Sequence, residues 1–247
     1  MSSIVALHGF TGTPSSFAPL AEYFGSANLL TPVSTGHGVP AQGSEVASFE
    51  AEVSRLARLA RDNSEGPVLV GYSLGGRLAL GIALQFAASF RGLVLISASA
   101  GLESEAARAE RRANDARWIA LLEEHGVEAF ADRWQAQPLF ATQLELSQSL
   151  IEAERHRRLS HTARGLAHSL RVTGLAEMPN YWPRLSEITL PVTLLAGARD
   201  PKFCASARRM ASQIPGAVVT EVPGVGHNLL LERPNAVIRA IEKGLLS

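Results

Sequence analysis

The 247-residue sequence predicts an α/β fold, with a mainly parallel sheet, helices on both faces and an inserted helical cap. Short apolar runs rich in β-branched residues alternate with amphipathic helical segments, which is typical of parallel sheets. The alternation stops over residues 102–186, where helical spacing continues without a convincing strand. A Gly-x-Ser-x-Gly turn at residues 71–75 joins one strand directly to the next helix. We therefore expect residues 1–101 and 187–247 to form the core and residues 102–186 to form the cap.

The individual elements follow from residue spacing and turn residues. Residues 3–7 form an apolar strand, and Pro14 suits the first turn of a helix that runs to about residue 24. Apolar side chains recur at helical spacing in residues 46–61. The other predicted strands are residues 29–33, 67–70, 91–97, 192–196 and 217–222, and the other predicted core helices are residues 74–88, 205–213 and 235–246.

Composition narrows the class of protein. The 23 basic and 23 acidic residues balance, so the charge does not indicate a nucleic-acid partner. No apolar run reaches the length of a membrane span, and no basic and apolar leader opens the chain, so we expect neither a span nor a secretion signal. The single cysteine, Cys204, cannot form an internal disulfide. These features predict a cytoplasmic protein, either a monomer or a small homo-oligomer.

Ser73 is the candidate nucleophile. Gly71 and Gly75 flank it in a tight strand-to-helix turn, where larger side chains would collide with neighbouring backbone. The helix that begins at Leu74 directs free N–H groups toward any oxyanion that forms near Ser73. We expect the backbone N–H groups of Phe10 and Leu74 to form the oxyanion hole.

Two polar residues follow later strands of the predicted sheet. Asp200 comes after the strand at 192–196, and His227 comes after the strand at 217–222. Because serine is a weak nucleophile and base by itself, it needs an imidazole to take its proton and a carboxylate to fix the imidazole tautomer. The order Ser73, Asp200, His227 is that of α/β-hydrolases. Glu221 and Glu232 are the competing candidates for the carboxylate.

With these motifs the chain resembles the 2-succinyl-6-hydroxy-2,4-cyclohexadiene-1-carboxylate synthases of menaquinone biosynthesis, a branch of the α/β-hydrolase superfamily. The resemblance covers nearly the whole chain. Members usually carry two strands before the one at residues 3–7, and we expect these to be absent here. The matching motifs are LHGFTG at 7–12, GYSLGGR at 71–77, Trp134 with PLFA at 138–141, LAHSLR at 166–171, AGARDPKF at 196–203 and GHN at 226–228.

The resemblance implies a carbon–oxygen lyase without a metal or another cofactor. Its small-molecule substrate, 2-succinyl-5-enolpyruvyl-6-hydroxy-3-cyclohexene-1-carboxylate, carries three carboxylates. Pyruvate is eliminated after a ring proton is removed, so the triad acts as a base and needs no acyl-enzyme. The alternative is a serine hydrolase, either a carboxylesterase or a carbon–carbon bond hydrolase, with an unknown small substrate.

A substrate with three carboxylates requires cationic partners, and arginine binds a carboxylate with two parallel hydrogen bonds. Arg77 lies four residues after Ser73, which puts both on one face of the predicted helix. By correspondence with the family, Arg158 is the favoured contact from the cap. The other candidate contacts are Tyr72, Trp134, Arg111, Arg112 and Arg117, and the sequence does not rank these last three arginines.

Overall fold

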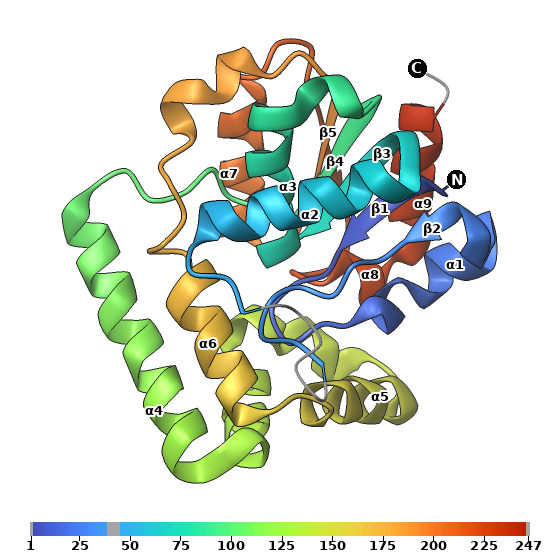
Figure 1. Cartoon of the computed structure of the whole chain (residues 1–247). Helices are drawn as coiled ribbons and strands as arrows, with labels where there is room; N and C mark the ends of the chain where they lie inside the picture. Colours follow the sequence, from blue (N-terminus) through green and yellow to red (C-terminus); the bar gives the residue numbers. More distant parts are fainter. Residues whose placement is uncertain (1, 39–44, 246–247) are drawn as a thin grey trace.

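The computed structural model describes residues 2–38 and 45–245. Within these ranges six strands form one sheet in the order β2-β1-β3-β4-β5-β6, and every neighbouring pair is parallel (Figure 1). The predicted parallel sheet is therefore confirmed. The strands are β1 (Ser2–Leu7), β2 (Leu29–Leu30), β3 (Ser64–Tyr72), β4 (Gly92–Ile96), β5 (Val192–Gly197) and β6 (Val218–Val222).

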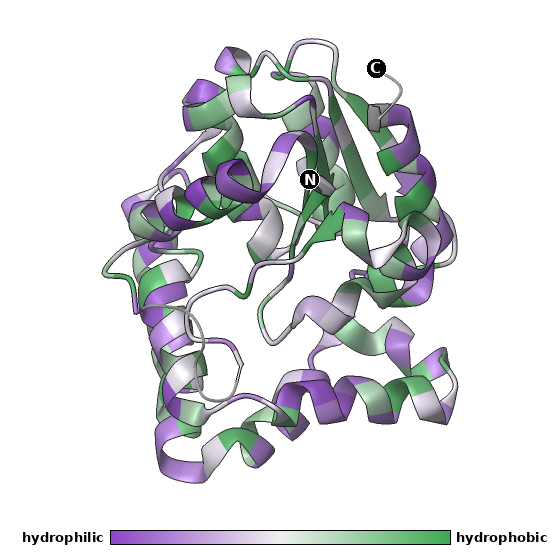
Figure 2. Ribbon diagram, turned by 45° about the vertical axis from the view of Figure 1, so that its right-hand side comes forward, coloured by the Kyte–Doolittle hydropathy of each residue, from purple (hydrophilic) through white to green (hydrophobic). Residues whose placement is uncertain are grey.

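Side chains alternate between the two faces of the sheet, and both faces are buried. Val5 and Leu7 pack into one apolar cluster, while Ile4 and Ala6 pack into the other. Figure 2 shows these apolar strands at the centre of the molecule. The first face is covered by α2 (Phe49–Asn63), α3 (Leu74–Phe86) and α7 (Pro201–Ala211), and the second by α1 (Ala18–Phe24), α8 (Leu229–Glu232) and α9 (Pro234–Leu245).

The segment between β4 and β5 is helical in the described residues, and most of its helices lie at one end of the sheet (Figure 1), whereas Trp182 and Leu185 pack into the first apolar cluster. It contains α4 (Glu105–Gln135), α5 (Gln148–Leu159) and α6 (Ala163–Thr173), with the 3-10 helices η4 (Pro138–Glu145) and η5 (Trp182–Glu187). Gly126 interrupts α4 with a φ of 79°. Leu121, Phe130 and Leu166 belong to a separate small apolar core. None of the helices in the described ranges has an apolar stretch long enough to cross a bilayer.

Capping residues explain where two helices depart from the predicted bounds. The side chain of Ser48 accepts the N–H of Ala51, so α2 begins three residues later than predicted. Asp200 accepts the N–H of Phe203, and Pro201 occupies the first turn, so α7 begins before residue 205. Residue 246, the expected end of the last helix, lies outside the described residues.

Candidate active site

Ser73 occupies a strained turn between β3 and α3. Its φ of 51° and ψ of −107° are rare for a residue with a side chain. Its N–H donates to the carbonyl of Ile96 on β4 at 2.9 Å. A Cβ on Gly71 would lie 2.4 Å from the carbonyl oxygen of Gly75, and a Cβ on Gly75 would lie 2.0 Å from that of Leu7. Both glycines are therefore required for this turn to close against the sheet.

Ser73, His227 and Asp200 form one hydrogen-bonded chain. Nε2 of His227 lies 3.1 Å from Oγ of Ser73, and Nδ1 lies 2.8 Å from Oδ2 of Asp200. The imidazole and the carboxyl group are both buried. Because a carboxylate only accepts hydrogen bonds, Nδ1 carries the proton and Nε2 is free to accept the serine proton. In this arrangement the imidazole can take the proton of Ser73, as both a serine nucleophile and a serine base require.

Two loops that follow β5 and β6 hold the imidazole in place. A Cβ on Gly197 would lie 2.0 Å from the carbonyl oxygen of Gly226, so the two loops touch through their backbones. Oγ of Ser97 donates to the carbonyl of His227 at 2.8 Å. The histidine is therefore fixed through its backbone as well as through Asp200.

The two competing glutamates have other partners. Glu232 accepts the N–H of Gly226 at 2.7 Å and the N–H of Asn228 at 3.3 Å, so it braces the loop around the histidine. Glu221 is paired with Arg208 on the surface. Neither glutamate is bonded to the imidazole of the triad in the described residues.

Phe10 and Leu74 line the same cavity as Ser73. In residues 2–38 and 45–245, neither residue's backbone N–H group donates a hydrogen bond to the protein. Leu74 is the first residue of α3, where helical N–H groups have no intrahelical acceptor. Phe10 and Leu74 therefore stay the predicted donors of an oxyanion hole, which needs preorganised N–H groups free to bind developing negative charge.

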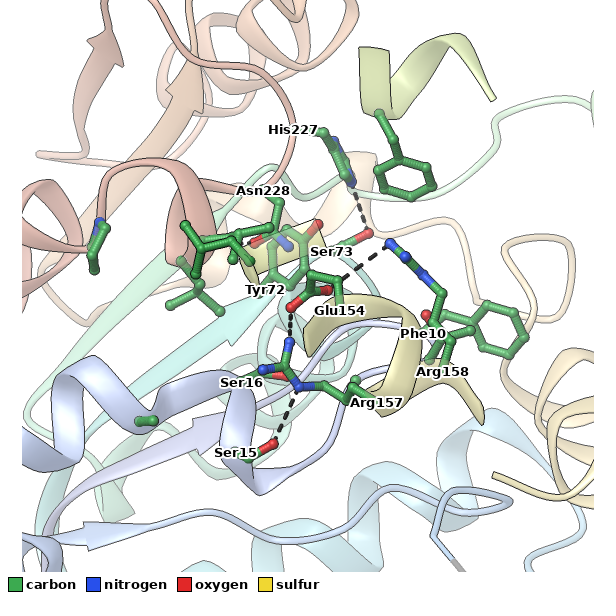
Figure 3. Close-up of a pocket in the computed structure, with 18 of the residues that line it drawn as sticks. Phe10, Ser15, Ser16, Tyr72, Ser73, Glu154, Arg157, Arg158, His227 and Asn228 are labelled. Atoms are coloured by element: carbon green, nitrogen blue, oxygen red, sulfur yellow. Dashed lines mark hydrogen bonds and ion pairs between the residues drawn. The ribbon is translucent and has the colours of Figure 1, made fainter. Parts of the chain in front are cut away.

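Two adjoining cavities open on either side of Ser73, which lines both of them. Both cavities are also lined by Phe10, Trp134, Leu139 and His227. We name each after one arginine in its lining. The Arg158 lobe has a volume of about 410 Å³, and its other lining residues include Tyr72, Phe140, Glu154, Arg157 and Asn228 (Figure 3). The Arg77 lobe has a volume of about 360 Å³, and its other lining residues include Arg111, Asn114, Trp118, Thr173 and Lys202.

The Arg158 lobe holds two guanidinium groups and one carboxylate. Arg158 is only 3% exposed, donates to Gln135 at 2.9 Å and lies over the ring of Phe140. Its burial lowers its pKa. Glu154 pairs with Arg157 and lies 3.9 Å from Arg158 (Figure 3). A single carboxylate between two arginines leaves this lobe with a positive charge for a ligand.

The Arg77 lobe repeats this pattern. Arg77 donates to the carbonyl of Thr173 at 2.9 Å. Burial, together with the charge of Arg111, lowers the pKa of Arg77 to about 9, so it remains protonated at neutral pH. Arg111 pairs with the carboxylate of Asp115 at 2.9 Å. Asp115 balances the charge of Arg111, and no carboxylate pairs with Arg77 among the described residues. This lobe therefore also carries a positive charge for a ligand.

Tyr72 and Trp134 provide the aromatic lining. The ring of Tyr72 lies 5.6 Å from that of His227, and burial raises the pKa of its hydroxyl. A Cβ on Gly9 would lie 2.8 Å from this ring, so the first loop packs directly on it. Trp134 stacks on Phe130 with ring centroids 5.3 Å apart and borders both lobes.

The structure does not bring Arg112 or Arg117 to the cavity. Arg112 is exposed and pairs with Glu105 and Glu177, and Arg117 is exposed. Successive helical residues are turned by about 100°, so Arg112 cannot share the face of Arg111, and Arg117 lies still further round. The expectation that these two arginines contact substrate is therefore corrected.

Four further lining residues, Asn114, Trp118, Glu154 and Arg157, were not among the predicted contacts, although helical spacing places them beside the predicted Arg111 and Arg158. Arg111, Asn114 and Trp118 follow an i, i+3, i+7 pattern on α4, which identifies one helix face. Glu154, Arg157 and Arg158 follow an i, i+3, i+4 pattern on α5.

Comparison with known proteins identifies the family. Residues 4–240 match the model of the alpha/beta hydrolase family. A relative from Bacillus subtilis (strain 168) is 34% identical over 99% of this chain and 90% of its own length. The 2-succinyl-6-hydroxy-2,4-cyclohexadiene-1-carboxylate synthase of Salmonella newport (strain SL254) is 35% identical over 97% of this chain and 92% of its own length.

Among solved structures, that of MenH from S. aureus is 34% identical. It superposes with a TM-score of 0.91 over 99% of this chain and 93% of that chain. The fold, the hydrogen-bonded triad and these similarities agree, and the chain belongs to the alpha/beta hydrolase family and, within it, to the 2-succinyl-6-hydroxy-2,4-cyclohexadiene-1-carboxylate synthases.

Proposed function

We propose that this chain is a carbon–oxygen lyase. It eliminates pyruvate from 2-succinyl-5-enolpyruvyl-6-hydroxy-3-cyclohexene-1-carboxylate and forms 2-succinyl-6-hydroxy-2,4-cyclohexadiene-1-carboxylate. The observation that carries the proposal is the pair of arginine-bearing lobes on either side of Ser73 and His227. The family membership and the hydrogen-bonded triad support it.

The substrate matches the charge of the two lobes. Its three carboxylates lie on the ring, at the end of the succinyl arm and on the enolpyruvyl group, so negative charge surrounds the reacting carbons. Arg158 with Arg157 faces one side of Ser73, and Arg77 with Arg111 faces the other. A neutral ester would bring no carboxylate to Arg158 and Arg77, which would leave each lobe with one unbalanced positive charge in a partly desolvated site. We assign residues 102–186 to a cap that selects the substrate, and residues 1–101 and 187–247 to the catalytic core.

In the reaction, Oγ of Ser73 removes the proton on the ring carbon that bears the succinyl ketone and passes its own proton to Nε2 of His227. The released electron pair forms a ring double bond, the existing double bond shifts by one position, and the bond to the enolpyruvyl oxygen breaks. The enolpyruvate takes a proton from the imidazolium and becomes pyruvate. Asp200 stabilises the imidazolium during this cycle.

The oxyanion hole acts on the succinyl ketone. As the neighbouring proton leaves, negative charge develops on the ketone oxygen, which gains enolate character. The N–H groups of Phe10 and Leu74 bind that oxygen and stabilise the charge. We also place the reaction in the cytoplasm.

The test is pyruvate release from the enolpyruvyl substrate. The release is monitored as NADH consumption in the presence of lactate dehydrogenase. A p-nitrophenyl ester assay is run in parallel. We expect rapid pyruvate release and, at most, slow ester cleavage. Rapid ester hydrolysis without pyruvate release would reject the lyase and favour the hydrolase.

A further inference from the structure

Three buried histidines meet beside the loop that carries Phe10. His8 follows β1, His37 lies in the loop after β2, and His161 lies in the cap between α5 and α6. Their relative exposures are 0%, 0% and 3%. The ring of His37 lies 4.8 Å from that of His8 and 5.2 Å from that of His161. None of the three rings lines either lobe of the cavity.

Two of these rings hold Thr11 from opposite sides. Nε2 of His37 accepts the backbone N–H of Thr11 at 3.2 Å, and Nε2 of His161 donates to the carbonyl of Thr11 at 3.0 Å. The second nitrogen of each ring is also engaged: Nδ1 of His37 donates to Thr35, and Nδ1 of His161 accepts the N–H of Gly38. Each ring is therefore a bridge between two backbone segments.

The loop that carries His37 is itself anchored by side chains. The N–H of Ser34 donates to Nε2 of His8 at 3.2 Å. The N–H of Thr35 donates to the carboxylate of Glu52 at 2.8 Å, and Glu52 is fully buried. This loop lies outside the sheet and, in the described part of the chain, has no backbone hydrogen bonds to a neighbouring strand to position it. The bonds to His8 and Glu52 take that role.

The bridges require neutral imidazoles, because a protonated ring has no acceptor nitrogen. Burial lowers the pKa of His8 to about 4 and lowers the pKa values of His37 and His161. The positive charge of Arg157 on α5 lowers the pKa of His161 further. The rings are therefore neutral donors and acceptors at neutral pH.

Thr11 needs this support because its backbone is strained. Its φ of 63° lies in the left-handed region, which a β-branched residue rarely adopts. Thr11 directly follows Phe10, whose N–H is the proposed oxyanion donor. The ring of Phe10 also lies 5.7 Å from that of His37. The orientation of the Phe10 peptide therefore depends on a neighbour held through both its N–H and its carbonyl.

We propose that His37 and His161 are positioning residues for the oxyanion hole. They hold Thr11 in its strained conformation and thereby direct the N–H of Phe10 at the reacting oxygen. His161 belongs to the cap and does not line the cavity. Through this residue the cap therefore stabilises the transition state indirectly, by holding Thr11. The inference rests on the proposed function, since that function assigns the oxyanion role to Phe10.

The first test compares His161→Ala with His156→Ala, which removes an exposed histidine from the same segment of the cap. We expect the kcat of His161→Ala to fall roughly 10- to 100-fold, because displacing one oxyanion donor acts on the transition state. KM should stay close to that of the wild-type enzyme. His161→Gln keeps a donor and an acceptor in one planar group and should recover part of the loss. His156→Ala should behave as the wild type.

A second readout separates this inference from the identity of the substrate. The rate at which a fluorophosphonate labels Ser73 also depends on the oxyanion hole, because the phosphonyl oxygen gains charge during attack. Labelling should slow in His161→Ala and in His37→Leu, and not in His156→Ala. Slower labelling together with no pyruvate release by the wild type would reject the proposed function and leave the positioning role supported.

Two results would overturn the inference. One is a folded His161 variant with wild-type kcat and wild-type labelling of Ser73. The other is a loss confined to KM or to melting temperature, which would assign His161 to substrate binding or to stability. If His161→Ala does not fold, the same comparison with His161→Leu and His37→Leu decides, because leucine fills much of the space of the ring and removes both hydrogen bonds.

Discussion

Gly36 and Gly165 pack backbone against backbone. A Cβ on Gly36 would lie 2.1 Å from the carbonyl oxygen of Gly165, and a Cβ on Gly165 would lie 2.4 Å from that of Gly36. The contact joins the loop that carries His37 to the first turn of α6, so the cap meets the core here without an intervening side chain. It also holds His161 within reach of Thr11.

Gly165→Ala should separate α6 from this loop. Overpacking of this kind costs about 1–3 kcal/mol of folding free energy, so the melting temperature should fall. Turnover should fall as well, because the bond between His161 and Thr11 weakens. Arg164→Ala, which changes an adjacent side chain that is 86% exposed, is the matched control. Unchanged melting and turnover in Gly165→Ala would show that the junction is loose.

Ser73→Ala and His227→Ala should each lower turnover by orders of magnitude. Because the two groups transfer one proton in concert, the double variant should be little slower than either single variant. The comparison is made on kcat with folding checked by circular dichroism. Losses that add in free energy would mean that the two residues do not act as one unit.

The triad and the sheet were predictable because their signals are local. The Gly-x-Ser-x-Gly turn contains its own steric reason, since Gly71 and Gly75 have no room for a Cβ. Asp200 and His227 follow the ends of parallel strands, which meet at one edge of a sheet. The hydrogen bonds between Ser73, His227 and Asp200 connect three residues that were predicted from the sequence to meet at this edge.

The cap was harder to predict because helix phase depends on tertiary packing. Arg111 and Arg112 are neighbours in sequence, yet only Arg111 borders the cavity. His161 and Thr11 are 150 positions apart in the sequence, and no local sequence pattern predicts the hydrogen bond between them. Such contacts arise from the docking of the cap, which periodicity within one helix does not specify.

Arg77→Lys should lose nearly as much activity as Arg77→Ala. Lysine keeps the charge and loses the planar pair of donors that binds a carboxylate. We expect a loss of about 2–4 kcal/mol in transition-state stabilisation, measured as kcat/KM. Arg112→Ala, on the exposed face of α4, should retain full activity. If Arg77→Lys is close to wild type, Arg77 does not bind a substrate carboxylate.

The buried histidines should make stability depend on pH. The pKa of His8 is about 4 in the folded protein and near 6.5 in the unfolded chain. As the pH falls from 6.5 to 4, the unfolded chain binds protons that the folded protein excludes, so stability decreases. His8 alone contributes a slope of about 1.4 kcal/mol per pH unit in this window.

Urea unfolding at several pH values measures this slope. His8→Gln retains an acceptor for the N–H of Ser34 and should flatten the slope between pH 6.5 and 4. His125→Ala removes a ring that is 59% exposed and should leave the slope unchanged. An equal slope in His8→Gln and the wild type would contradict the neutral, buried state of His8.

In the proposed mechanism Ser73 removes a proton and forms no bond to the substrate. Rapid-quench mass spectrometry of the enzyme during turnover distinguishes this from covalent catalysis. While pyruvate accumulates, the peptide that contains Ser73 should keep its unmodified mass at every time point. A substrate-derived adduct on Ser73 that forms and decays at the rate of turnover would contradict the lyase mechanism and establish covalent catalysis.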